Sequence, residues 1–103
     1  MKLNVKQRIN LMNILPTETN YATLKIVNDL RSSLSFSEDE FKEFEMRTED
    51  KMIFFNPLKD REIEVAVGEK ATDIIVEALT KLDKDNKINE GNISLYEKFI
   101  INK

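Results

Sequence analysis

The hydrophobic pattern of this 103-residue chain changes its period twice. Up to residue 43, and again from residue 69, apolar residues recur every three to four positions, which is typical of amphipathic helices. Between these parts lie three short stretches, 44–49, 52–55 and 61–67, whose apolar residues alternate or run together as in strands. The pattern predicts an α+β fold with two N-terminal helices, a short acidic helix, a three-stranded antiparallel sheet and two C-terminal helices.

The N-terminal helices have recognisable starts and ends. Asn4 is a good N-cap residue, and Gln7 stands where a capping box requires a glutamine or glutamate. Pro16 ends this first helix near residue 15. A second helix is predicted over about 21–33, with Leu24, Val27, Leu30 and Leu34 facing inward.

Segment 36–41 carries the clearest local signal. Ser37 and Glu40 form a second capping box, while Phe36 and Phe41 form a hydrophobic staple around it. A short third helix is therefore predicted to begin at residue 38. Its acidic first turn complements the helix dipole.

The predicted sheet is a meander of 44–49, 52–55 and 61–67. Ile63, Val65 and Val67 occupy alternate positions and are expected to face the core. A sheet of this size is not stable alone and requires helices against it.

The strongest helical pattern follows the sheet. Gly68 is expected to cap a helix whose apolar stripe consists of Ala71, Ile74, Ile75, Ala78, Leu79 and Leu82. A last helix is predicted from about Glu90 to Ile100, with Asn89 as its N-cap. The length of the chain fits a single α+β domain spanning residues 1–103.

The composition excludes several chemistries. The sequence has no cysteine and no histidine, which excludes thiolate catalysis, the Ser-His-Asp triad and the common zinc ligands. Its two glycines cannot form a phosphate-binding loop. We therefore expect no cofactor, no metal and no enzymatic activity. An enzyme that uses carboxylates and a metal is the least favoured class of function.

Two acidic segments are candidates for metal sites. The segment 83–94 resembles a calcium loop only at its start, because Ile88 and Ser94 replace the glycine and the glutamate that such a loop needs. The other is a cluster that consists of Glu38, Asp39, Glu40, Glu43 and Glu45. It is either a metal site, a surface that imitates phosphate charge, or a solvated helix start, and the last interpretation is favoured.

No apolar run approaches the length of a membrane span, and segment 1–8 lacks the apolar region of a signal peptide. We expect a soluble protein of the cytoplasm that does not bind membranes.

Candidate binding residues are few. Basic side chains that could contact a phosphate or another small anionic ligand, if the fold gathers them, are Arg8, Lys25, Arg31, Arg47 and Arg61. Phe54 and Phe55 cannot both face one side of a strand. One is expected in the core, and the other is either covered by a helix or exposed for a protein partner.

The order of elements offers an alternative function. Three helices followed by two strands mimic a winged-helix DNA-binding regulator, in which the helix starting at Glu38 would enter the groove. That helix carries five acids and one lysine over residues 38–45, so duplex DNA would repel it. With a net charge of −3 for the whole chain, no duplex DNA binding is expected.

The predicted sheet has two edges that prolines and bulges do not protect. Helices of the same chain or a symmetric homo-oligomer would cover them, and the oligomer is slightly favoured.

The chain resembles small bacteriophage- and prophage-encoded proteins in segments 3–16, 23–25, 34–38, 68–75 and 94–99. That group carries no assigned activity, so the resemblance implies a context and no site residues. It implies a phage accessory factor in the host cell cytoplasm that binds, sequesters or blocks a host or phage partner. The sequence thus favours a non-enzymatic interaction protein.

Overall fold

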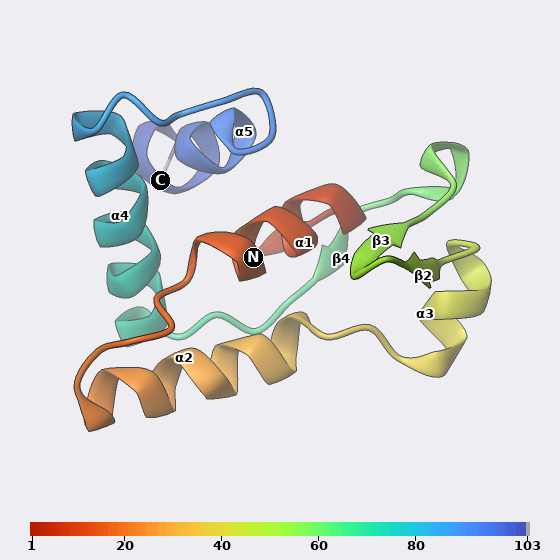
Figure 1. Ribbon diagram of the computed structural model, residues 1–103, viewed down its shortest axis with the longest axis horizontal. Helices are drawn as coiled ribbons and strands as arrows, with labels where there is room; N and C mark the ends of the chain where they lie inside the picture. Colours follow the sequence, from red (N-terminus) through yellow and green to blue (C-terminus); the bar gives the residue numbers. More distant parts are fainter. Residues whose placement is uncertain (103) are drawn as a thin grey trace.

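The computed structural model describes residues 1–102, and its composition is α+β as predicted (Figure 1). The helices are α1 (Val5–Ile14), α2 (Tyr21–Leu34), α3 (Glu38–Glu43), α4 (Glu69–Lys84) and α5 (Ile93–Tyr96). The strands are β1 (Lys2–Leu3), β2 (Arg47–Glu49), β3 (Met52–Phe54) and β4 (Ile63–Glu64). Two further turns are the 3₁₀ turn η1 (Pro57–Lys59) and the π-helical turn η2 (Glu97–Ile101).

Both predicted capping boxes are confirmed. The side chain of Asn4 accepts from the N–H of Gln7 at 2.8 Å, and the Gln7 side chain accepts from the N–H of Asn4 at 3.1 Å. Ser37 and Glu40 make the same reciprocal pair at 3.2 and 3.0 Å. Each pair binds backbone donors that the first turn of a helix leaves without partners.

The predicted staple and the end of α3 are also visible. The rings of Phe36 and Phe41 meet edge to face, with centroids 6.4 Å apart. Beyond the helix, the N–H of Met46 donates to the carbonyl of Phe41, and Glu45 takes a φ of 53°. This is a Schellman ending, in which glycine is the usual left-handed residue and a glutamate stands instead.

One hydrophobic cluster lies among α1, α2, α4 and the C-terminal segment. Ala71, Ile75 and Leu79 on the predicted stripe of α4 are buried, which confirms that face of the helix. The buried residues around them are Leu3, Leu11, Leu15, Val27, Leu30, Leu34, Val65, Leu95 and Phe99. None of the helices in residues 1–102 combines the length and the apolar character needed to cross a bilayer.

The predicted three-stranded sheet is wrong in its pairing. β2 and β3 form an antiparallel hairpin with Thr48 opposite Ile53, and no third strand joins them within residues 1–102. β4 pairs instead with β1, a strand that the sequence analysis did not predict, and Leu3 lies opposite Ile63. Of the three residues expected to face the core, Val65 is buried, while Ile63 and Val67 are half-buried.

The turn after β3 explains this difference. Asn56 accepts from the N–H of Leu58 and starts η1, which leads the chain away from the hairpin. The carboxylate of Asp60 then accepts from the N–H of Val5 at 2.8 Å. This bond places the following strand beside the N-terminus, where β1 is its neighbour.

The last helix begins at Ile93, later than predicted. The side chain of Asn89 accepts from the N–H groups of Gly91 and Asn92, which are the bonds expected of an N-cap, and it caps the turn that leads into α5. The side chain of Asn92 in turn accepts from the N–H of Asn89 at 2.8 Å. Past α5 the backbone widens into η2, where the N–H of Asn102 donates to the carbonyl of Glu97.

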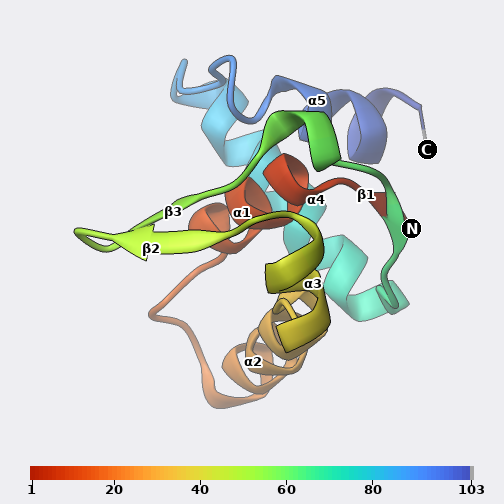
Figure 2. The same ribbon diagram turned by 90° about the vertical axis from the view of Figure 1, so that its right-hand side faces the viewer.

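The β2–β3 hairpin projects from the body of the molecule, with its turn at the far end (Figure 2). Its base is fixed by a bond from the N–H of Asn56 to the carbonyl of Phe44 at 2.9 Å. Phe44 is fully buried, while every residue of β2 and β3 is exposed. The hairpin is therefore anchored at one end and free at the other.

Candidate functional site

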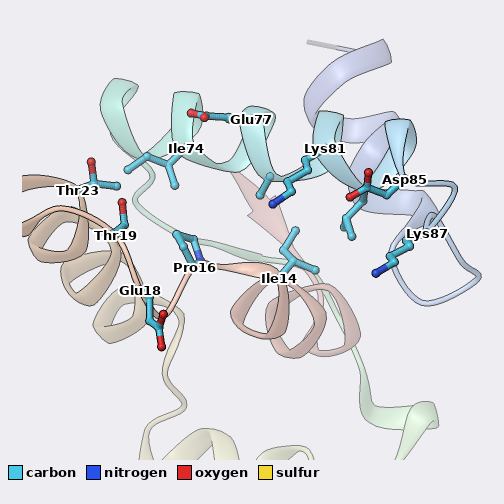
Figure 3. A pocket seen from close by; sticks show the side chains of 12 residues that line it. Ile14, Pro16, Glu18, Thr19, Thr23, Ile74, Glu77, Lys81, Asp85 and Lys87 are labelled. Atoms are coloured by element: carbon cyan, nitrogen blue, oxygen red, sulfur yellow. The ribbon is translucent and has the colours of Figure 1, made fainter.

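A groove of about 460 Å³ lies between the end of α1 and α4 (Figure 3). Ile14, Pro16 and Ile74 give it apolar walls. Charged residues of both signs lie around it, namely Glu18, Glu77, Lys81, Asp85 and Lys87. In the described chain, every buried side-chain polar atom has a hydrogen-bond partner, so no such atom awaits a ligand here. The groove consequently indicates no ligand class.

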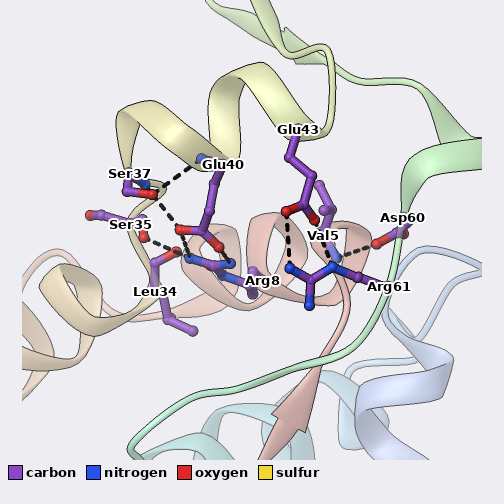
Figure 4. Close-up of polar contacts among 9 residues, drawn as sticks. All are labelled: Val5, Arg8, Leu34, Ser35, Ser37, Glu40, Glu43, Asp60 and Arg61. Carbon is purple, nitrogen blue, oxygen red and sulfur yellow. Dashed lines mark hydrogen bonds and ion pairs between the residues drawn. The ribbon is translucent and has the colours of Figure 1, made fainter.

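Two of the five acids in the cluster of residues 38–45 pair with arginines. Glu40 pairs with Arg8, and Glu43 pairs with Arg61 (Figure 4). Within residues 1–102, no three acidic side chains are grouped so that they could hold a metal ion. This geometry agrees with the interpretation of the cluster as a helix start with a solvated face.

Arg8 lies in a buried junction between three helices. Its side chain is 3% exposed, and its Nη1 donates to Glu40 Oε2 at 2.6 Å. Nη2 donates to the carbonyl of Ser35 at 2.6 Å, and Nε donates to the carbonyl of Leu34 at 3.1 Å. The guanidinium also lies 4.0 Å from the ring centroid of Phe36, within the range of a cation–π contact.

This junction gives Arg8 a structural role in place of the predicted contact with an anion. Its guanidinium already neutralises one carboxylate and supplies donors to two carbonyls that the end of α2 leaves without helical partners. The hydrogen bond from Arg8 holds the pKa of Glu40 below its usual range. The residue ties α1 to the end of α2 and to α3.

The other predicted cations do not converge on one site. Arg61 binds Glu43 through two hydrogen bonds of 2.6 and 3.0 Å at the surface. Arg31 donates to the carbonyl of Leu15 at 3.3 Å, and Lys25 is exposed on α2. The fold therefore does not gather the arginines into an anion site.

Three carboxylates are expected to make the fold less stable at low pH. Hydrogen bonds from Arg8, Arg61 and Lys98 lower the pKa values of Glu40, Glu43 and Glu62 respectively from 4.5. Below that pH the unfolded chain binds more protons than the folded chain, so the free energy of unfolding falls as the pH falls through the folded-state pKa values. We expect urea midpoints that fall steadily below pH 4.5. The loss caused by Glu40→Gln should shrink over the same range, and an equal loss at neutral and acid pH would contradict this origin.

Three of the predicted residues do come together on the hairpin. Arg47, Phe54 and Phe55 line a hollow of about 280 Å³ with Glu45 and Asn56. The guanidinium of Arg47 lies 5.2 Å from the ring centroid of Phe54. The prediction that one phenylalanine enters the core is wrong, because Phe54 is 38% exposed and Phe55 is half-buried. The reason is that the hairpin stands away from the body.

Neither a family model, nor a curated protein, nor a solved structure matches this chain. The resemblance to phage-encoded proteins stays a prediction.

The hairpin surface consists of Met52, Ile53 and Phe54 on β3 with Arg47 and Glu49 on β2. All three β3 residues are at least 36% exposed, and Met52 is 60% exposed. The binding residues predicted from the sequence did not include Met52, Ile53 and Glu49. The signal for the first two was present, since an apolar run in so short a strand has residues on both faces and a lone hairpin covers neither.

Proposed function

We propose that this chain is a non-enzymatic interaction protein of the cytoplasm that binds a protein partner through the β2–β3 hairpin. The observation that supports this proposal is the exposure of all three apolar residues of β3 on an element that projects from the body. Contiguous exposed apolar surface is a mark of protein interaction sites. The resemblance described above suggests a phage accessory factor as the context.

The backbone of the hairpin suggests how a partner binds. A free strand edge presents unpaired N–H and C=O groups, to which an extended segment of another chain can add. β2 and β3 pair only with each other within residues 1–102, so each has one open edge. Strand addition would supply the hydrogen bonds, and Met52 and Phe54 would supply apolar contact.

Affinity capture with matched variants tests the proposal. The parent chain should retain a partner protein in a fixed ratio, and the double variant Met52→Ser/Phe54→Ser should lose it. Leu58→Ser is the control, because Leu58 is 92% exposed but lies outside the hairpin. Capture by the double variant at the parent's level, with an unchanged melting temperature, would refute the hairpin as the binding element.

The winged-helix alternative receives less support. α3 spans only six residues, and Glu38, Asp39 and Glu43 are exposed on it. A recognition helix must instead enter a groove lined by phosphates, and phosphates repel carboxylates.

We accordingly expect no sequence-specific binding of duplex DNA at physiological salt. The measurement is a gel shift with a pool of random duplexes, at a chain concentration in the micromolar range. A sequence-dependent shift that weakens with added salt would contradict the proposed function and favour the DNA-binding regulator.

A further inference from the structure

We propose that the hairpin binds a second copy of this chain, which pairs antiparallel along β2 about a two-fold axis at Thr48. The inference rests on the proposed function, because it uses the same hairpin. It names one partner for the β2 edge and a register for the pairing.

The turn of the hairpin determines which backbone groups are free. Asp50 and Lys51 have φ angles of 48° and 66°, as in a two-residue turn of type I′. Glu49 and Met52 flank this turn, so they exchange both of their backbone hydrogen bonds. The residues of the next pair, Thr48 and Ile53, make no backbone hydrogen bonds to each other, because bonded and non-bonded pairs alternate. The N–H and C=O of Thr48 therefore point outward from β2. Thr48 of one copy can therefore exchange two hydrogen bonds with Thr48 of another.

The charges along β2 are self-complementary in that register. Centring the antiparallel pair on Thr48 places Arg47 of each copy opposite Glu49 of the other, so two ion pairs form. Both are in positions without backbone hydrogen bonds, where opposing side chains are closest. Both side chains are exposed, at 66% and 58%, and within one strand Arg47 Nε lies 3.6 Å from Glu49 Oε1. The dimer therefore exchanges this weak surface pair in each copy for a pair between copies.

Other arrangements of the edges lack this specificity. A parallel pairing in register would place Arg47 against its own copy, which is repulsive. The β3 edge carries only apolar side chains and does not distinguish one apolar strand from another. Pairing through β2 makes a four-stranded sheet in the order β3-β2-β2-β3, in which Met52 and Phe54 of both copies share one face. Such a sheet is more stable than a lone hairpin.

Charge reversal on β2 provides the experiment, with light scattering and sedimentation over a concentration series. The parent should reach the mass of a dimer. Arg47→Glu and Glu49→Arg should each weaken self-association by about tenfold or more, since like charges then face each other twice. An equal mixture of the two variants should recover the dimer. In the mixed pair, the new carboxylate faces the new guanidinium, and Glu49 of one copy faces Arg47 of the other.

Lys25→Glu is the control for Arg47→Glu, because it makes the same change of charge on α2 and should leave the dimer unchanged. A parent that stays monomeric throughout the series, or a dimer that responds to neither β2 variant, would overturn the inference. A monomeric parent with hairpin-dependent capture of another protein removes this inference and leaves the proposed function. A dimer that is weakened by the two β2 variants, in a chain that captures no other protein, supports this inference and removes the proposed binding of another protein.

Discussion

Replacing Leu79 by alanine is expected to lower the free energy of unfolding by about 2–5 kcal/mol, the usual cost for a buried leucine. Leu79 is fully buried at the centre of the α4 stripe. Its helix packs against α1, α2 and the C-terminal segment, so the cavity left by the missing carbons lies among several elements. No single element can move to close it.

A thermal or urea melt measures this loss. In a domain of this size each kcal/mol shifts the melting temperature by roughly 4 °C or more, so a fall of at least about 8 °C is expected. Leu79→Met nearly conserves volume and should cost less than about 1.5 kcal/mol. Glu77→Ala, exposed on the same helix, should change little. A melting temperature for Leu79→Ala equal to that of the parent would mean that the stripe is not the core.

Removing the carboxylate from the Arg8 junction is the second large effect. Glu40→Ala leaves a guanidinium that is 3% exposed without its counter-ion, and this should cost about 3 kcal/mol. Part of the loss comes from the capping box, since Glu40 also accepts from the N–H of Ser37. Glu43→Ala is the matched control on the same helix. It breaks a pair of equal length with Arg61 at the surface, where solvent replaces the lost partner, and should have little effect.

A double substitution tests whether the loss in Glu40→Ala comes from leaving the buried charge of Arg8 unpaired. Arg8→Met combined with Glu40→Leu removes both charges, and it also removes the donors of Arg8 to the carbonyls of Leu34 and Ser35. Its loss should still be smaller than the sum of the losses in the two single variants, because no unpaired ion remains. Urea unfolding of the variants gives the comparison. If the double variant loses as much as the sum of the separate losses, burial of the charge is not the reason for the expected effect.

Local signals predicted the helices well. The capping boxes at Asn4 and Ser37 and the stripe of α4 each depend on residues within a few positions of one another. The pairing of strands does not. β1 has only two residues, too few for any alternation, and its partner lies some sixty positions away. Nothing local to Lys2 or Leu3 indicates that contact.

The candidate site was predictable in kind but not in detail. Residue type alone does not distinguish Arg8 from Arg47, yet Arg8 is buried beneath α3 and Arg47 is exposed on the hairpin. What separates them is the position of α3 over α1, which is a property of the tertiary structure. The sequence shows the excess of apolar residues over 52–55. Whether another element covers these side chains depends on where η1 directs the chain.

The pairing of β1 with β4 has a consequence for the chain as it leaves the ribosome. Leu3 is made some sixty residues before Ile63, the residue opposite it, and Lys98, which donates to the carbonyl of Lys2, comes later still. At about 5–20 residues per second, several seconds separate the two strands, and the partner of Lys2 follows seconds later still. During that interval the apolar side of α1 has no α4 to cover it. The hydrophobic core, which includes Leu95 and Phe99, is therefore complete only after these two residues have been made.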